Sequence, residues 1–265
     1  MTRLIYQNLG NGIRYPLLYA HRGCSTLAPE NTLPAFQYVL DLKIPGVELD
    51  IHMCKSGEVV VTHDLSLKRV TGYEGLVADT DYETISKLDA GFWFDKKYTG
   101  TRIPLLNEVF ELLGKNVYYD IEIKHRKMKT GPLEKKLLEL ISEYDLTERC
   151  IISSFNPFAL REVRALTRDI QVAIIYSNHE DVPVILRNGE GRLISSCEIL
   201  KPHSPKVNKL WMFAYNTMLR YPVLPWTVDD EDEARFLLDL GVQGLISNVP
   251  EKLSKIILSR QRQDN

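Results

Sequence analysis

Short apolar runs alternate with amphipathic segments along almost the whole chain. Several apolar runs are nearly continuous, as expected of parallel strands that are covered on both faces. They are Leu17–Ala20, Gly46–His52, Val59–Thr62, Val117–Ile123, Cys150–Ser153, Gln171–Tyr176, Ile194–Leu200, Pro222–Trp226 and Gly244–Ile246. Segments with helical spacing lie between them: Thr32–Leu42, Leu105–Leu113, Leu133–Tyr144, Pro157–Leu166, Lys206–Tyr215, Glu231–Leu240 and Pro250–Ser259.

This repeated order of strand and helix favours a parallel sheet. About eight such units in about 250 residues fit a TIM (β/α)8 barrel. We therefore predict a single barrel domain over residues 1–265. A doubly wound open sheet is the alternative. The absence of a Gly-x-Gly-x-x-Gly motif after the first strand weakens a Rossmann reading but leaves other open sheets available.

One stretch interrupts the alternation, after the second strand and its hairpin. Residues 65–102 contain four glycines and six aromatic side chains. A loop of this length inside a compact domain is usually a lid or an insertion with a small structure of its own. We expect an insertion at the functional end of the barrel, with a merely decorative excursion as the alternative.

Charge and composition exclude several classes of protein. The chain has 33 Lys and Arg against 35 Asp and Glu, a net charge of −2, which argues against a nucleic-acid partner bound by a broad basic face. No apolar run reaches about 18 residues, so we expect no membrane anchor. The start, Met1–Leu18, lacks the apolar core of a signal peptide, which predicts a cytoplasmic protein. The four cysteines are expected to be reduced thiols.

Acidic side chains alternate along the second strand. Period two places Glu48, Asp50 and His52 on one face, while the apolar residues between them face the helices. Buried carboxylates are costly unless they are paired. A hard cation, Mg²⁺ or Ca²⁺, would offset that cost, and ion pairs with interior Lys or Arg are the alternative. His52 is more readily explained as a satisfied rim histidine than as a ligand.

The strand Val117–Ile123 continues the pattern toward the same centre. Asp120, Glu122 and Lys124 share one face, so Glu122 adds a third carboxylate and Lys124 adds a cation. Three acids around one divalent ion, with Arg22 and Lys124 for the remaining anionic charge, describe a site for a phosphate ester. Ion pairing without a metal remains the alternative reading.

Two histidines follow neighbouring strands. His21 and Arg22 end the first strand, where barrels carry their catalytic groups, and His63 follows the return strand of a hairpin. Paired acid and base histidines suit the cleavage of a P–O bond at neutral pH. Trp226 closes a later strand, where its ring either walls the pocket or packs in the core.

These motifs together resemble the glycerophosphodiester phosphodiesterase family, and the likeness extends from about Leu18 to Pro250. The motifs occur in the family's order: His21-Arg22-Gly23, Pro29-Glu30-Asn31-Thr32, Glu48-Leu49-Asp50, His63-Asp64, Ile103-Pro104-Leu105 with Glu108, Ile121-Glu122-Ile123-Lys124, Ser154-Phe155, Trp226-Thr227-Val228 and Gly244-Leu245-Ile246. The resemblance implies a TIM barrel with an insertion after the second strand, matching the organisation described above. It also implies hydrolysis of a small-molecule glycerophosphodiester to glycerol 3-phosphate and an alcohol.

The resemblance further implies a role for each matching residue. His21 and His63 match the general acid–base pair, and Glu48, Asp50 and Glu122 match the ligands of one divalent cation, Mg²⁺ or Ca²⁺. Arg22 and Lys124 match the phosphate contacts. The chain departs from the family pattern at Gln243 and Ser56, where Asp is common. We expect these departures to affect turn geometry and the end of the last strand, not the chemistry.

Two other functions fit parts of this pattern. A phospholipase-like lyase would also use two histidines and would release a cyclic phosphate. A non-catalytic barrel that binds phosphorylated ligands is the other alternative, although a binder has no need of both histidines. We take His21 as the base and His63 as the acid. The attacking group is either water or a neighbouring hydroxyl of the glycerol itself.

Overall fold

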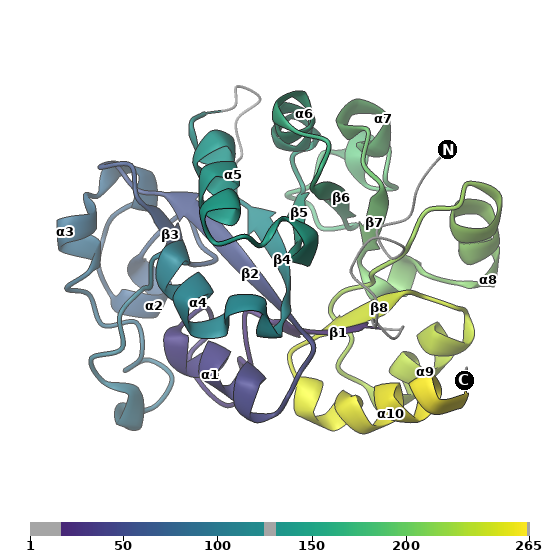
Figure 1. Ribbon diagram of the computed structural model, residues 1–265, viewed down its shortest axis with the longest axis horizontal. Helices are drawn as coiled ribbons and strands as arrows, with labels where there is room; N and C mark the ends of the chain where they lie inside the picture. Colours follow the sequence, from purple (N-terminus) through teal and green to yellow (C-terminus); the bar gives the residue numbers. More distant parts are fainter. Residues whose placement is uncertain (1–16, 125–130, 264–265) are drawn as a thin grey trace.

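The parallel strands form a curved sheet with helices on its outside in the computed structural model, which describes residues 17–124 and 131–263 (Figure 1). Neighbouring strands follow the order β7-β6-β5-β4-β2-β1-β8, and each adjacent pair is parallel. The strands are β1 (Leu17–His21), β2 (Gly46–Met53), β4 (Tyr118–Ile123), β5 (Cys150–Ser154), β6 (Gln171–Tyr176), β7 (Ile199–Pro202) and β8 (Gly244–Ser247). The short β3 (Val59–Val61) pairs antiparallel with β2 as the predicted hairpin.

An extended segment, residues 222–226, closes this sheet into a barrel. It forms parallel bridges from Val223 to Leu200 and from Trp226 to His203, on the side of β7. On its other side it accepts hydrogen bonds from the N–H groups of Gln243 and Ile246, at 3.1 Å each. The predicted (β/α)8 fold is thus confirmed, but this eighth segment forms isolated bridges instead of a regular strand. Two of its five residues, Pro222 and Pro225, are prolines and have no N–H to donate to a ladder.

Helices surround the barrel (Figure 1). The longer ones agree with the predicted segments to within a few residues. They are α1 (Leu33–Asp41), α4 (Leu106–Leu113), α5 (Leu133–Glu143), α6 (Pro157–Leu166), α9 (Glu231–Asp239) and α10 (Pro250–Gln263). The start of α9 shows why the sequence marks it clearly: the Asp230 carboxylate accepts the N–H groups of Asp232 and Glu233, at 3.0 and 2.9 Å. In the described residues, no helix combines the length and apolar character needed to cross a membrane.

Two predicted elements between β6 and the closing segment are wrong in their bounds. The predicted strand Ile194–Leu200 begins inside a short helix, α7 (Arg192–Ser195). Ser196, with φ +51°, caps this helix before β7 starts. A short apolar run does not by itself distinguish a helix end from a strand start. The predicted helix Lys206–Tyr215 is broken into η7 (Ser204–Lys206), α8 (Lys209–Met212) and a π-helical segment, η8 (Phe213–Met218).

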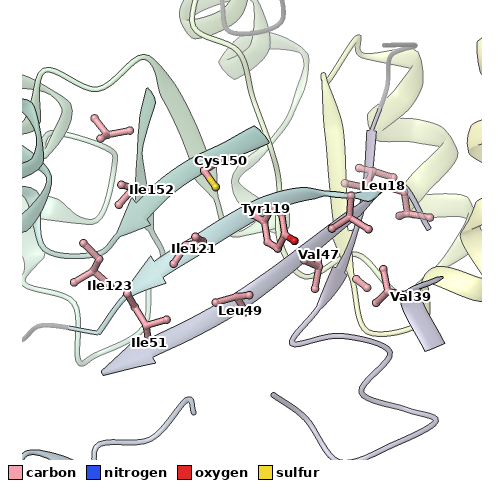
Figure 2. Close-up of a cluster of buried hydrophobic side chains, with 14 of the residues drawn as sticks. Leu18, Val39, Val47, Leu49, Ile51, Tyr119, Ile121, Ile123, Cys150 and Ile152 are labelled. Atoms are coloured by element: carbon pink, nitrogen blue, oxygen red, sulfur yellow. The ribbon is translucent and has the colours of Figure 1, made fainter. Parts of the chain in front are cut away.

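The two faces of the strands pack differently. The outward side chains of β2 and β4, among them Val47, Leu49, Ile121 and Ile123, form an apolar layer under the helices (Figure 2). Inside the barrel, a second apolar cluster fills the end where the strands begin. It contains Leu17, Tyr19, Ile151, Ala173, Ile199, Leu224 and Ile246. The polar inward residues follow these apolar ones along the strands, so they lie toward the carboxyl ends of the barrel.

Residues 65–102 contain four short helical segments: α2 (Lys68–Thr71), η2 (Val77–Asp79), α3 (Tyr82–Ile85) and η3 (Lys96–Tyr98). Their apolar residues form a separate cluster with Val60 and Cys54 of the hairpin region. The Tyr98 hydroxyl donates to the Leu27 carbonyl at 2.7 Å, which fixes the segment to the loop after β1. Residues 1–16, on which most of the signal-peptide prediction rests, lie outside the described ranges.

Candidate active site

Three carboxylates meet at the carboxyl ends of two adjacent strands. Glu48 and Asp50 come from β2 and Glu122 comes from β4, where Asp50 and Glu122 are partners in register. One oxygen of each lies within 4.8 Å of the others, and the residues are only 2%, 1% and 6% exposed. The alternation in the sequence predicts this cluster. It arises because inward residues at the same level of neighbouring parallel strands lie side by side.

Two cations contact these carboxylates directly. Lys124 Nζ lies 3.0 Å from Asp50 Oδ1 and 2.7 Å from Glu122 Oε1, and Arg22 Nε lies 3.4 Å from Asp50 Oδ2. Although burial opposes both charges, the carboxylates raise the pKa of Lys124, and Lys124 and Arg22 hold the pKa of Asp50 well below its usual range. The ion pairing that we consider as the alternative to a metal is therefore present at two of the three acids.

Glu48 is the acid with the least positive charge in contact with it. Its Oε2 accepts the backbone N–H of Arg22 at 3.1 Å, and His21 Nε2 is 3.8 Å away. Burial, and then the neighbouring charge of Asp50, raise the pKa of Glu48 well above its ordinary value. A divalent cation would relieve this repulsion, and a buried set of carboxylate oxygens is what Mg²⁺ and Ca²⁺ prefer. The residues therefore fit the expected cofactor.

His21 is held by a chain of hydrogen bonds that begins after β8. The Asn248 side-chain N–H donates to Asp229 Oδ2 at 2.7 Å, and its backbone N–H donates to Asp229 Oδ1 at 2.8 Å. Asn248 therefore presents its Oδ1 to His21 Nδ1, at 2.6 Å. The hydrogen of the His21 ring then sits on Nδ1, and Nε2 carries the lone pair on the side of Glu48. Burial, followed by the positive charge of Arg22, lowers the pKa of His21 to about 4.

His63 follows β3, the return strand of the hairpin, and its side chain is 31% exposed. Its Nδ1 donates to Asp64 Oδ1 at 2.7 Å, which leaves Nε2 available for proton transfer. His52 supports this position from below, because its Nε2 donates to the backbone carbonyl of His63 at 3.1 Å. His52 is thus a buried, satisfied histidine with a supporting contact, in line with the interpretation from the sequence.

The loop between β1 and α1 adds polar groups that sequence reasoning missed. Arg22 and Gly23 have φ values of +58° and +78°, and a Cβ on Gly23 would come within 2.9 Å of Ala35, so this tight turn requires glycine. The turn leads to Asn31, whose side-chain N–H donates to Asp50 Oδ2 at 2.8 Å. The sequence marks Asn31 only as part of the Pro29-Glu30-Asn31-Thr32 motif, and no sequence motif singles out Asn248 or Asp229.

Trp226 lies at the end of the closing segment, between two other rings. The centroid of its ring is 5.5 Å from that of Phe155 and 5.3 Å from that of His203, and its Nε1 donates to the Lys201 carbonyl at 2.9 Å. The side chain is partly exposed. The ring also packs against the apolar cluster that fills the interior of the barrel.

A further ion pair lies inside the barrel, beside Glu48 and one level before Asp50 and Glu122. Lys201 Nζ is 2.6 Å from Asp120 Oδ2 and donates to Ser153 Oγ at 2.9 Å, while Ser153 donates to Asp120 Oδ1 at 2.7 Å. Asp120 is the register partner of Glu48. Sequence alternation places Asp120 on the inner face correctly, but the lysine that pairs with it comes from a strand 81 positions away, a separation that follows from the two residue numbers.

The fold and this site define a class: an α/β barrel with an acidic, histidine-flanked centre at the carboxyl ends of its strands. The model of the glycerophosphoryl diester phosphodiesterase family matches residues 21–252. The chain therefore belongs to this family of phosphoric diester hydrolases.

Relatives and solved structures agree with that membership. A glycerophosphodiester phosphodiesterase of Caldanaerobacter subterraneus is 35% identical over 255 residues, which cover 91% of this chain and 97% of the relative. The structure of an Oleispira antarctica phosphodiesterase in complex with its product sn-glycerol-3-phosphate has a TM-score of 0.77 and 29% identity, and covers 91% and 96% of the two chains. A Silicibacter pomeroyi structure, with a TM-score of 0.82, 23% identity and coverage of 96% and 97%, supports the fold alone.

Proposed function

We propose that this protein is a metal-dependent phosphodiesterase that hydrolyses glycerophosphodiesters to glycerol 3-phosphate and an alcohol. The observation that carries the proposal is the meeting of three buried carboxylates with His21 and Arg22 at one barrel end. Family membership supports the reaction class. The names of the relatives support the substrate class, since one is called a glycerophosphodiester phosphodiesterase and another binds sn-glycerol-3-phosphate as its product.

In this proposal, Glu48, Asp50 and Glu122 hold one Mg²⁺ or Ca²⁺. The bound cation supplies Lewis-acid stabilisation of the charge on the phosphoryl oxygens. Arg22 and Lys124 have more N–H donors than their carboxylate contacts use, so each can also donate to a phosphate oxygen. These charge-assisted hydrogen bonds strengthen as negative charge grows in the transition state.

The two histidines divide the proton transfers. The Asn248 oxygen keeps the hydrogen of His21 on Nδ1, so Nε2 can accept a proton from the attacking hydroxyl, and His21 is the base. His63, whose ring is oriented by Asp64, then protonates the leaving alcohol. Either water or a neighbouring glycerol hydroxyl can attack in this scheme, and the second route passes through a cyclic phosphate. In this proposal, Trp226 forms part of the wall of the substrate pocket at the barrel mouth.

Phosphorus NMR of turnover tests this function. We expect the purified protein, given a panel of glycerophosphodiesters with Mg²⁺ or Ca²⁺, to release glycerol 3-phosphate as the final phosphorus product. A cyclic phosphate that persists would favour the lyase instead. Saturable binding of the panel with no turnover would show a non-catalytic binding barrel.

Removal of the cation is the second test. Exhaustive treatment with EDTA is expected to lower turnover by at least about tenfold, with recovery on adding Mg²⁺ or Ca²⁺. Without the cation, the negative carboxylates would repel the negative charge on the phosphoryl oxygens. Calorimetric titration should also show cation affinity about tenfold weaker in Glu122→Gln. Glu139→Gln, at an exposed position on α5, is the matched control and should bind the cation normally. Turnover that is indifferent to chelation, with no measurable cation binding, would refute the metal.

A further inference from the structure

Arg69 on α2 joins two carboxylates that come from different parts of the chain. Its Nη2 and Nη1 donate to Glu30 Oε1 and Oε2, at 2.6 and 3.2 Å, and its Nε donates to Asp64 Oδ2 at 2.5 Å. Glu30 belongs to the loop after β1, and Asp64 follows β3. One guanidinium therefore connects both loops to residues 65–102.

Each of these carboxylates also contacts a residue of the site. Glu30 Oε1 accepts from Arg22 Nη1 at 3.0 Å, and Asp64 Oδ1 accepts from His63 Nδ1 at 2.7 Å. Arg69 is thus a single carboxylate away from the histidine assigned as the acid and from the arginine assigned to the phosphate. It does not itself contact the acid cluster through any of the bonds described here.

The geometry needs an arginine. A guanidinium presents its N–H groups as a rigid planar fork, so it can donate two bonds to Glu30 and a third to Asp64 at once. The Trp93 ring lies 5.7 Å from the guanidinium carbon and restricts it further. Although burial opposes ionisation, the Arg69 hydrogen bonds hold the pKa values of Glu30 and Asp64 below their usual range, so both carboxylates are charged acceptors.

We propose that Arg69 is a positioning residue that orients His63 through Asp64 and Arg22 through Glu30. On this view residues 65–102, which we propose are an insertion at the barrel mouth, complete the catalytic geometry from outside the barrel. The inference rests on the proposed phosphodiesterase function. It adds a residue that neither the spacing of the sequence motifs nor the acid cluster indicates.

The chain offers a matched control in the same segment. Arg102 also donates two hydrogen bonds to one carboxylate, Glu108, at 2.5 and 2.9 Å, and its side chain is 42% exposed against 43% for Arg69. Both Arg69→Gln and Arg102→Gln remove a partly exposed bidentate pair. We expect similar losses in Tm, but only Arg69→Gln should lower kcat, by at least about tenfold. Equal kcat values for the two variants would overturn the inference.

Two further variants separate positioning from charge and from folding. Arg69→Lys keeps the charge but lacks the fork, so an intermediate kcat is expected, and wild-type kcat would overturn the bridging role. In a double-mutant cycle, adding Arg69→Gln to Asp64→Asn should cost less than Arg69→Gln alone, because the path to His63 is already cut. Fully additive losses in kcat would contradict action through Asp64.

A readout independent of turnover keeps the inference distinct from the proposed function. The ¹⁵N NMR signals of the His63 ring should shift or broaden in Arg69→Gln and stay unchanged in Arg102→Gln. Unchanged His63 signals in both variants would refute the positioning role, even with turnover intact. Normal His63 shifts upon Arg69→Gln combined with no turnover in the unmodified protein would instead refute both proposals.

Discussion

Replacing His21 with alanine should lower kcat by about 10²–10⁴-fold, the usual contribution of a general base. The expectation rests on the ring orientation. Asn248 Oδ1 accepts a hydrogen bond from His21 Nδ1, so the Nε2 lone pair lies on the side of Glu48, where the phosphate would bind. Alanine removes that acceptor and leaves the carboxylates in place. Cation affinity, measured by calorimetry, should therefore remain while turnover is lost.

His63→Ala should cause a loss of similar size, for the complementary reason that the leaving alcohol is no longer protonated. Because the two proton transfers belong to the same displacement at phosphorus, the double variant should lose little more than either single variant. His179→Ala is the matched control, since that side chain is 66% exposed in the loop after β6 and contacts only Asp181 among the described ion pairs. Single variants with near wild-type kcat would refute the acid–base pair.

The acid cluster is the part of the site that the local sequence pattern predicts best. Alternation along β2 and β4 assigns Glu48, Asp50 and Glu122 to the inner face, and parallel pairing of adjacent strands then brings them within 4.8 Å. Predicting the cluster requires only two facts, the period of a strand and the order of strands in the sheet, and the pattern of apolar runs indicates both. The barrel is predictable for the same reason.

The hydrogen bonds around the histidines cannot be predicted from the sequence in this way. His21 and Asn248 are separated by 227 positions, and Arg69 and Glu30 by 39. Each pair joins the loops that follow different strands, and the path of a loop depends on turns such as the left-handed Arg22-Gly23 pair. A polar residue after a strand indicates that something polar stands at the barrel mouth, but not which partner it meets.

The two departures from the family pattern also become understandable only in three dimensions. Gln243 Oε1 accepts the N–H of Val223 at 2.7 Å, so its longer side chain helps to fasten the closing segment to β8. Ser56 Oγ donates to Glu58 and accepts the N–H of Tyr82 at 2.8 Å, which ties the hairpin turn to residues 65–102. Both contacts concern closure and turn geometry, where the sequence placed the expected effect.

Replacing Lys201 with methionine should destabilise the protein by about 3–5 kcal/mol, the usual cost of removing one partner of a buried ion pair. Lys201 is 1% exposed and Asp120 is fully buried, so the variant leaves a carboxylate inside the barrel with Ser153 as its remaining contact. Urea unfolding should show the loss as a lower midpoint with an unchanged slope.

The double variant Lys201→Met with Asp120→Leu should recover much of that stability. The attraction within a buried ion pair is only slightly larger than the free-energy cost of removing both charges from water, so apolar side chains of similar size can replace the pair. Lys87→Met provides the exposed comparison. Lys87 pairs with Glu83 at 2.9 Å on the surface of residues 65–102, where such a pair contributes about 0.5 kcal/mol or less. If Lys201→Met were as mild as Lys87→Met, water would have to reach Asp120, which would contradict the complete burial of Asp120 inside the barrel.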